Sequence, residues 1–224
     1  MVIIGGAAAL QPQFKVHVVD DDASVRSALS RLFRAVGYAA ETFDSAEAYL
    51  LAASPDDPGC LVLDVMMPGM DGLTLQERMA ERGLETPIVF ISAHGDIPAS
   101  VRAMKGGAVD FLEKPFDDEG LLGAVDSAIQ LDVELRKQRA ARLEVQHGLD
   151  HLTPREHEVL TYVISGMLNK VIARELEVSE KTVKVHRGRV MNKMGARSLA
   201  NLVRMAETVG IEPAKRRKTT GGAA

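Results

Sequence analysis

Between residues 15 and about 142, short apolar runs alternate with segments whose apolar residues recur at helical spacing. This alternation predicts βα units around a parallel sheet. Strands are predicted at Lys15 to Val19, Tyr38 to Phe43, Cys60 to Asp64, Pro87 to Ile91 and Val109 to Glu113. Helices are predicted between them, at Ala23 to Val36, Ser45 to Ala53, Leu73 to Arg82 and Ile97 to Lys105. We therefore expect an α/β domain with a doubly wound, five-stranded parallel sheet.

A fifth helix is predicted from near Asp117 onward, because no proline or glycine stands between Gly123 and Gly148 and apolar residues recur there near helical spacing. Its charged second half is expected to be a helical linker. Two interpretations of the linker remain open. It either self-associates, or it is a solvated helix with one side resting on the first domain.

A second helical pattern begins at Thr153, which is expected to cap a helix with Pro154 in its first turn and Glu156 completing a capping box. Short loops separate four predicted helices, at Pro154 to Ser165, Lys170 to Leu176, Glu180 to Met194 and Ser198 to Val209. This is the pattern of an all-α helix-turn-helix domain. The expected segments are a disordered extension at 1–13, the α/β domain at 14–130, the linker at 131–150, the helix-turn-helix domain at 151–210 and a disordered basic tail at 211–224.

Charge divides the chain into two parts of opposite sign. Residues 14–133 hold 9 Lys and Arg against 21 Asp and Glu, a net charge of −12, whereas residues 134–224 hold 18 against 10, a net charge of +8. The asymmetry indicates a polyanionic partner, such as nucleic acid, for the second part alone. No apolar run is long enough to span a membrane, and the single cysteine, Cys60, agrees with a reducing cytoplasm, where we expect the protein.

Carboxylates are predicted to gather at one edge of the sheet. Asp20, Asp21 and Asp22 follow the first predicted strand, and Asp64 ends the third. Ligands bind at this carboxyl edge in open α/β sheets, and oxygen ligands that repel one another favour Mg²⁺. Ser92 and Lys114 follow the fourth and fifth strands, so the edge offers the groups that accept a phosphoryl group.

Four motifs resemble the receiver domain of bacterial two-component response regulators: V-V-D-D-D at 18–22, L-D-V-M-M-P-G-M-D-G at 63–72, I-S-A at 91–93 and E-K-P-F at 113–116. The resemblance implies that Asp64 is the phosphoacceptor and that Lys114 contacts the phosphoryl group. It implies a Mg²⁺ site formed by Asp20, Asp21, Asp64 and the backbone carbonyl of Met66. Ser92 and Phe111 would be the switch pair.

The segments at 152–160 and 169–186 resemble the four-helix output domain of the NarL/LuxR group, and together with this receiver they are most similar to the FixJ-like subfamily. The third helix of that domain is strongly basic and fits a recognition helix in the major groove of DNA. The DNA contacts expected from its basic residues and from the resemblance are Lys181, Thr182, Lys184, Val185, His186, Arg187 and Lys193. Gly188 departs from the pattern, because relatives often have a longer side chain there.

These resemblances imply a phosphorylation-activated, DNA-binding transcription regulator rather than an enzyme. Its expected partners are a sensor histidine kinase, promoter DNA and a second copy of the chain, which would dimerise on phosphorylation.

Three other functions are alternatives for parts of this sequence. An aspartyl-phosphate hydrolase of the haloacid dehalogenase type needs a second aspartate where this chain has Met66. A flavodoxin-like protein would need to bind the FMN phosphate beside an Asp-rich loop that repels it. The third is a DNA-binding regulator whose receiver acts only as a phosphorylation-independent dimerisation module.

Overall fold

The structure, a computed structural model, describes residues 14–93 and 97–215. The chain divides into two compact units, Met1–Arg136 and Lys137–Ala224. The extension predicted at 1–13 and most of the tail predicted at 211–224 lie outside the described residues. None of the described helices is both long and apolar enough to cross a membrane.

The first unit contains a five-stranded parallel sheet, so the predicted fold class is confirmed. The strand order is β2-β1-β3-β4-β5, in which two βα halves diverge from the middle of the sheet. The strands are β1 (Lys15–Val19), β2 (Ala39–Phe43), β3 (Gly59–Asp64), β4 (Ile88–Ser92) and β5 (Asp110–Glu113). Every residue of β3 and β4 is buried, as is expected for central strands covered on both faces.

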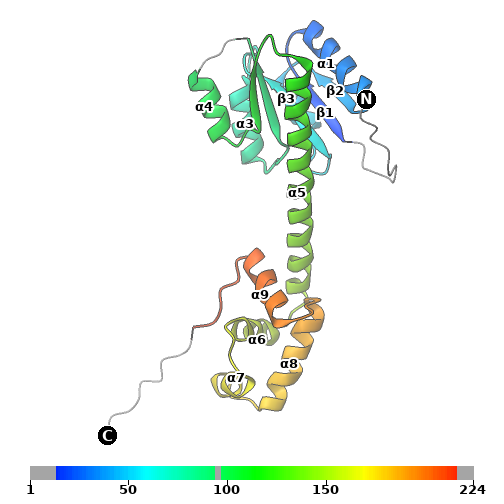
Figure 1. The fold of residues 1–224 in the computed structure, drawn as a ribbon. Coiled ribbons are helices and arrows are strands. Elements are labelled where there is room, and N and C mark those ends of the chain that lie inside the picture. The colour runs from blue at the N-terminus through cyan, green and yellow to red at the C-terminus, as the bar shows by residue number, and fades with distance from the viewer. Residues whose placement is uncertain (1–13, 94–96, 216–224) are drawn as a thin grey trace. The chain divides into compact units, whose positions relative to one another are not determined.

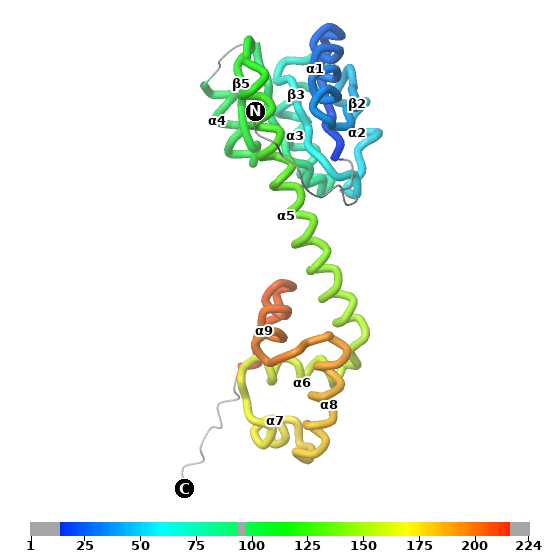
Figure 2. The backbone as a smooth tube through the Cα atoms, turned by 45° about the vertical axis from the view of Figure 1, so that its right-hand side comes forward, coloured from blue at the N-terminus to red at the C-terminus, as the bar shows by residue number. Residues whose placement is uncertain are grey.

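Helices cover both faces of this sheet (Figures 1 and 2). They are α1 (Ala23–Ala35), α2 (Ala46–Ala52), α3 (Gly72–Glu81), α4 (Ile97–Lys105) and α5 (Asp118–Asp150). Phe33 of α1 and Leu121 of α5 belong to the core on one face, whereas Tyr49 of α2 and Met79 of α3 belong to the core on the other. Asp22, Ser45 and Asp71 accept backbone hydrogen bonds at the starts of the first three helices, which fixes where each begins.

Hydrogen bonds of a buried carboxylate join the middle of α5 to the edge of the sheet at which the strands begin. Asp132 is 3% exposed and accepts hydrogen bonds from the backbone N–H of Gly59 (3.0 Å) and from Nε of Arg136 (2.7 Å). Arg136 also donates to the backbone carbonyls of Asp56 (3.0 Å) and Asp57. These contacts hold the helix to the first unit as far as Arg136.

The second unit is helical, as predicted, and comprises the end of α5 together with α6 (Pro154–Ile164), α7 (Asn169–Glu175), α8 (Glu180–Lys193) and α9 (Leu199–Thr208). The predicted capping box between Thr153 and Glu156 is present at the start of α6. Val145 in the last turns of α5 is buried in the core of this unit. At Gly148, a Cβ atom would lie 3.2 Å from the carbonyl oxygen of Lys193, so the glycine lets α5 pack closely on the end of α8.

Candidate phosphorylation and DNA-binding sites

Two buried carboxylates and a lysine meet at the carboxyl edge of the sheet. Asp20 follows β1, Asp64 ends β3 and Lys114 follows β5, and parallel strands bring these three ends together. Nζ of Lys114 lies 2.8 Å from Oδ2 of Asp20 and 2.8 Å from Oδ1 of Asp64. The carboxylates are only 1% and 4% exposed. The lysine therefore bridges two negative charges that would otherwise face each other inside the protein.

The surroundings of Asp64 disfavour its charge, whereas its two oxygens are held in place. Burial raises the pKa of Asp64 above its usual range, and the hydrogen bond from Lys114 only partly opposes this. The other oxygen, Oδ2, accepts a hydrogen bond from the backbone N–H of Met66 at 2.9 Å. Burial acts to lower the pKa of Lys114, but its hydrogen bonds to Asp20 and Asp64 outweigh burial and raise it. Lys114 thus stays cationic beside a carboxylate that is costly to ionise.

The other aspartates of the first loop lie outside this bridge. Asp21 and Asp22 are exposed. The Asp22 carboxylate caps α1 by accepting hydrogen bonds from the hydroxyl and the backbone N–H of Ser24, and these bonds lower its pKa. The backbone N–H of Asp22 donates to Oδ1 of Asp20 at 2.8 Å. The loop therefore orients Asp20 inward while leaving Asp21 at the rim.

Ser92 and Phe111 lie on the two neighbouring strands beside the bridge. Ser92 ends β4 and is 2% exposed, and its carbonyl accepts a hydrogen bond from the backbone N–H of Lys114 at 2.7 Å. Phe111 of β5 is half-buried and lies beside Phe90, with ring centroids 6.2 Å apart. The Lys114–Pro115 peptide bond is cis.

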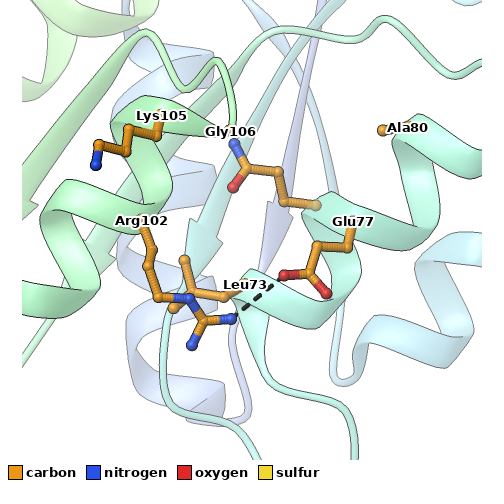
Figure 3. Close-up of a pocket in the computed structure, with 7 residues that line it drawn as sticks. Leu73, Glu77, Ala80, Arg102, Lys105 and Gly106 are labelled. Atoms are coloured by element: carbon orange, nitrogen blue, oxygen red, sulfur yellow. Dashed lines mark hydrogen bonds and ion pairs between the residues drawn. The ribbon is translucent and has the colours of Figure 1, made fainter.

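A separate groove of about 330 Å³ runs between α3 and α4 (Figure 3). Arg102 and Glu77 face each other across it and form an ion pair of 3.3 Å. The buried amide of Gln76 also donates to the carbonyl of Ala103 at 3.1 Å, so buried as well as exposed contacts join the two helices. These contacts fix α4 so that its outer face exposes Ile97, Val101 and Met104.

In the second unit, α8 presents a basic outer face and an apolar inner one. Val183 and Val190 are fully buried, whereas Lys181, Lys184 and Val185 are exposed. Within residues 14–93 and 97–215, neither Lys181 nor Lys184 has an ion-pair partner. A helix packed on one side and basic on the other, preceded by the short helix α7, is the arrangement of a helix-turn-helix recognition helix.

Comparison with known proteins identifies the family of each part of the chain. Residues 16–126 match the response regulator receiver domain family, and residues 150–206 match the luxR family of bacterial regulatory proteins. The transcriptional regulatory protein FixJ of Azorhizobium caulinodans is 45% identical over 199 residues, which are 89% of this chain and 94% of that protein. The chain belongs to the FixJ-like response regulators. Such proteins are transcription regulators controlled by phosphorylation, with a receiver and a LuxR-type DNA-binding domain.

Two further relatives of this FixJ-like regulator span nearly the whole chain. Nodulation protein W of Bradyrhizobium diazoefficiens is 48% identical over 207 residues, 92% of this chain and 91% of that protein. Among solved structures, the response regulator StyR is 49% identical with a TM-score of 0.77, over 87% of this chain and 98% of that one.

The residues of the receiver pocket fit the Mg²⁺ that receiver domains generally bind at their phosphorylation site. Among the described residues, no three Asp, Glu, His or Cys side chains lie together as a metal site. Mg²⁺ does not require such a set, because it retains several waters and binds through one or two carboxylates. Asp20 and Asp64 supply hard oxygen donors, Asp21 follows Asp20 directly, and Met66 lies two residues after Asp64.

The other DNA-contact residues predicted on the recognition helix of this FixJ-like regulator differ in their hydrogen bonds and burial. Thr182 is tied to the cap residue Ser179, whose Oγ accepts from its backbone N–H at 3.1 Å. His186 is half-buried, and within the described part of the chain its Nδ1 has no hydrogen-bond partner. Arg187 donates to the side chain of Asn169 on α7 at 3.3 Å. Asn169 had not been predicted as part of the site, and no sequence signal marked it, because this contact joins two helices.

Lys193 lies apart from the basic face. Its Nζ is 2.6 Å from Oε2 of Glu156, which is 1% exposed, and 3.0 Å from the carbonyl of His151. The sequence interpretation counted Lys193 among the DNA contacts. Its side chain is 35% exposed, but its ammonium is paired with Glu156, so we do not include it among the DNA contacts proposed for α8.

Proposed function

We propose that this FixJ-like regulator accepts a phosphoryl group on Asp64 from a sensor histidine kinase, dimerises, and then binds promoter DNA through α8. One observation carries the proposal above all others. Lys114 bridges Asp64 and Asp20 at 2.8 Å each, which gives a buried carboxylate a fixed cation beside it. The lysine can stabilise the added phosphoryl oxygens without any rearrangement of the strands.

In this proposal Asp64 is the nucleophile. A carboxylate oxygen of Asp64 attacks the phosphorus, a new P–O bond forms, and the bond to the donor's histidine nitrogen breaks. Asp20, Asp21, Asp64 and the carbonyl of Met66 would hold Mg²⁺, which when bound neutralises charge on the transferred group. Lys114 would shift from its ion pairs to the phosphoryl oxygens.

Ser92 and Phe111 are proposed to carry the signal to the surface. Once Asp64 is phosphorylated, Ser92 and Lys114 can each gain a charge-assisted hydrogen bond of roughly 1.5 to 3 kcal/mol. Together these approach the about 5.5 kcal/mol that moves a two-state equilibrium from 1:99 to 99:1. Phe111 is half-buried beside Phe90, and in this proposal its ring turns inward when Ser92 moves.

The surface of α4 and β5 is proposed as the dimer interface. Val101 and Met104 are 45% and 47% exposed on α4, an unusual exposure for large apolar side chains close to each other on a helix. A dimer would raise the effective concentration of the second recognition helix at its half-site.

On α8, Lys184 and Val185 are proposed to face base edges, and Lys181, Thr182, His186 and Arg187 to lie nearer the backbone. Exposure supports the first pair, since both side chains lie on the outer face of the helix. The contact of Arg187 with Asn169 supports a fixed guanidinium near the start of α7.

The test is phosphorylation of the full chain with a small-molecule phosphodonor and Mg²⁺, followed by intact mass, sedimentation and DNA binding. We expect one acid-labile phosphoryl group, a shift from monomer to dimer, and tighter binding to a duplex selected from a random library. A dimer that forms and binds DNA equally well without phosphorylation would instead indicate a receiver that acts only as a dimerisation module. A phosphorylated monomer that binds tightly would overturn the dimerisation step.

A further inference from the structure

Gly188 lies in the interior of the recognition helix, at a position where no contact within the described part of the chain requires a glycine. It is the ninth of the fourteen residues of α8 and is exposed. Glycine weakens a helix interior more than any residue except proline, so its presence there needs a reason. Its φ angle is not in the left-handed region that favours glycine.

Packing does not supply that reason. A Cβ atom built on Gly188 meets nothing within 4 Å in the described part of the chain. Two other glycines do have internal reasons, whereas Gly123 of α5, like Gly188, meets nothing within 4 Å. A Cβ at Gly148 would lie 3.2 Å from the backbone of Lys193 and Met194, and one at Gly106, just after α4, would lie 2.5 Å from Gln76.

Open space alone does not identify a binding position. The residues that surround Gly188 on α8 are the second observation. Residues three and four apart on a helix lie side by side. The neighbours of Gly188 at this spacing are Lys184, Val185, Met191 and Asn192, and Lys181 lies one turn further along the same face. Met191 is partly buried against the core, whereas the other four are exposed. The buried Val183 and Val190 lie on another side of the helix. Gly188 is thus a gap in the middle of the outer, basic face.

We infer that Gly188 is a specificity-determining position, at which the bare helix backbone lies directly against the base edges of the DNA major groove. The inference rests on the proposed function of α8. A helix without a side chain at its centre can enter the groove more deeply, which brings Lys184 and Val185 closer to the bases on either side. A methyl group at this position would hold the helix away from the bases.

The inference predicts opposite effects of one substitution on stability and on DNA binding. Gly188→Ala should raise the thermal midpoint of the DNA-binding domain by roughly 2 to 8 °C, because alanine favours the helix and the methyl group meets nothing. It should weaken binding to the preferred duplex by about 5- to 150-fold, which is the range for losing one base contact. Binding to a scrambled duplex of the same composition should change by less than about twofold, because the protein makes the same phosphate contacts with both duplexes.

The experiment uses the full chain treated with a small-molecule phosphodonor, a duplex selected by the wild type from a random-sequence library, and calorimetry of each variant. Gly123→Ala is the matched control, because Gly123 also lies exposed in a helix, with nothing within 4 Å of an added Cβ, but in α5 of the receiver. The control should stabilise the receiver and leave DNA binding unchanged.

Two results would overturn the inference. Gly188→Ala binding the selected duplex as tightly as the wild type would mean that no close approach occurs there. Tighter binding by Gly188→Lys would mean that the position has room for a longer side chain. A wild type that selects no duplex at all would contradict the proposed DNA-binding function instead, so the two failures are distinguishable.

Discussion

Each unit of this protein holds a lysine against a buried carboxylate, yet the two contacts differ in consequence. In the receiver, Lys114 lies 2.8 Å from Asp64, and burial leaves the pKa of that carboxyl raised. In the DNA-binding unit, Lys193 lies 2.6 Å from Glu156, and this hydrogen bond together with that from the Thr153 backbone lowers the pKa of Glu156 to about 2.

The difference lies in which influence on the carboxyl is largest. Burial is the largest influence on Asp64 and raises its pKa, although Lys114 and the backbone N–H of Met66 both donate to it. The hydrogen bond from Lys193 is the largest influence on Glu156 and lowers its pKa. The charge of Asp64 is therefore under-compensated, and that of Glu156 is well compensated. An under-compensated carboxylate is suited to react with an electrophile, whereas a fully compensated one stabilises the fold.

The largest expected effect is on the receiver side of this comparison. Asp64→Asn should abolish phosphoryl uptake, because the amide is nearly isosteric but cannot act as the nucleophile. Intact mass after treatment with a small phosphodonor and Mg²⁺ measures the effect. Asp44→Asn, an exposed carboxylate after β2, is the control and should be labelled normally. Labelling of the Asp64 variant at the wild-type level would contradict the site.

The next largest effect distinguishes Lys184, on the outer face of α8, from Lys193, which pairs with Glu156. Lys184→Ala should weaken binding to a selected duplex by about 1 to 3 kcal/mol and relax its sequence preference. Lys193→Ala should keep the preference of the wild type, because its ammonium contacts Glu156 rather than the outer face. Fluorescence anisotropy on selected and scrambled duplexes, at a temperature where both variants are folded, makes the comparison. Equal weakening of Lys184→Ala on both duplexes would identify a phosphate contact.

The same chemical change should have different effects on stability in the two units. Glu156→Gln removes a well-compensated charge and should lower the free energy of unfolding by about 1 to 3 kcal/mol. Asp64→Asn removes a poorly compensated one and should leave the receiver at least as stable as before. Urea unfolding of the full-length variants, followed by far-UV circular dichroism, gives both values. A receiver that loses as much stability as the DNA-binding unit would show that Asp64 is fully compensated after all.

The smallest effect is a pH dependence of the DNA-binding unit. The pKa of Glu156 is depressed from 4.5 to about 2 in the folded state, so its contribution to stability is fully present above pH 4.5 and is lost as the pH falls toward 2. Between these values the wild type should lose stability faster than Glu156→Gln. Parallel acid titrations of thermal midpoints would test this, and curves of the same slope would contradict it.

Much of the fold followed from local patterns. Alternation of apolar runs and helical segments is set by the periods of strands and helices, which is why the order and type of the elements could be predicted. The capping box at Thr153 is likewise local, because its partners are three residues apart. The receiver pocket was also accessible from sequence, since parallel strands deliver their carboxyl ends to one edge whatever their exact packing.

Contacts between residues that lie far apart in the sequence became known only from the tertiary structure. Helical period shows which way a side chain points from its own helix, but not which residue of another helix it meets. It therefore could not separate Lys193, which pairs with a glutamate 37 residues away, from Lys184, which has no ion-pair partner among the described residues. The same holds for Asp132, which reaches the backbone of Gly59 across 73 residues. The sequence by itself determined the elements, the motifs and the opposite charges of the two parts, because these depend on near neighbours. Which charges were left exposed for a partner depended on how the helices packed.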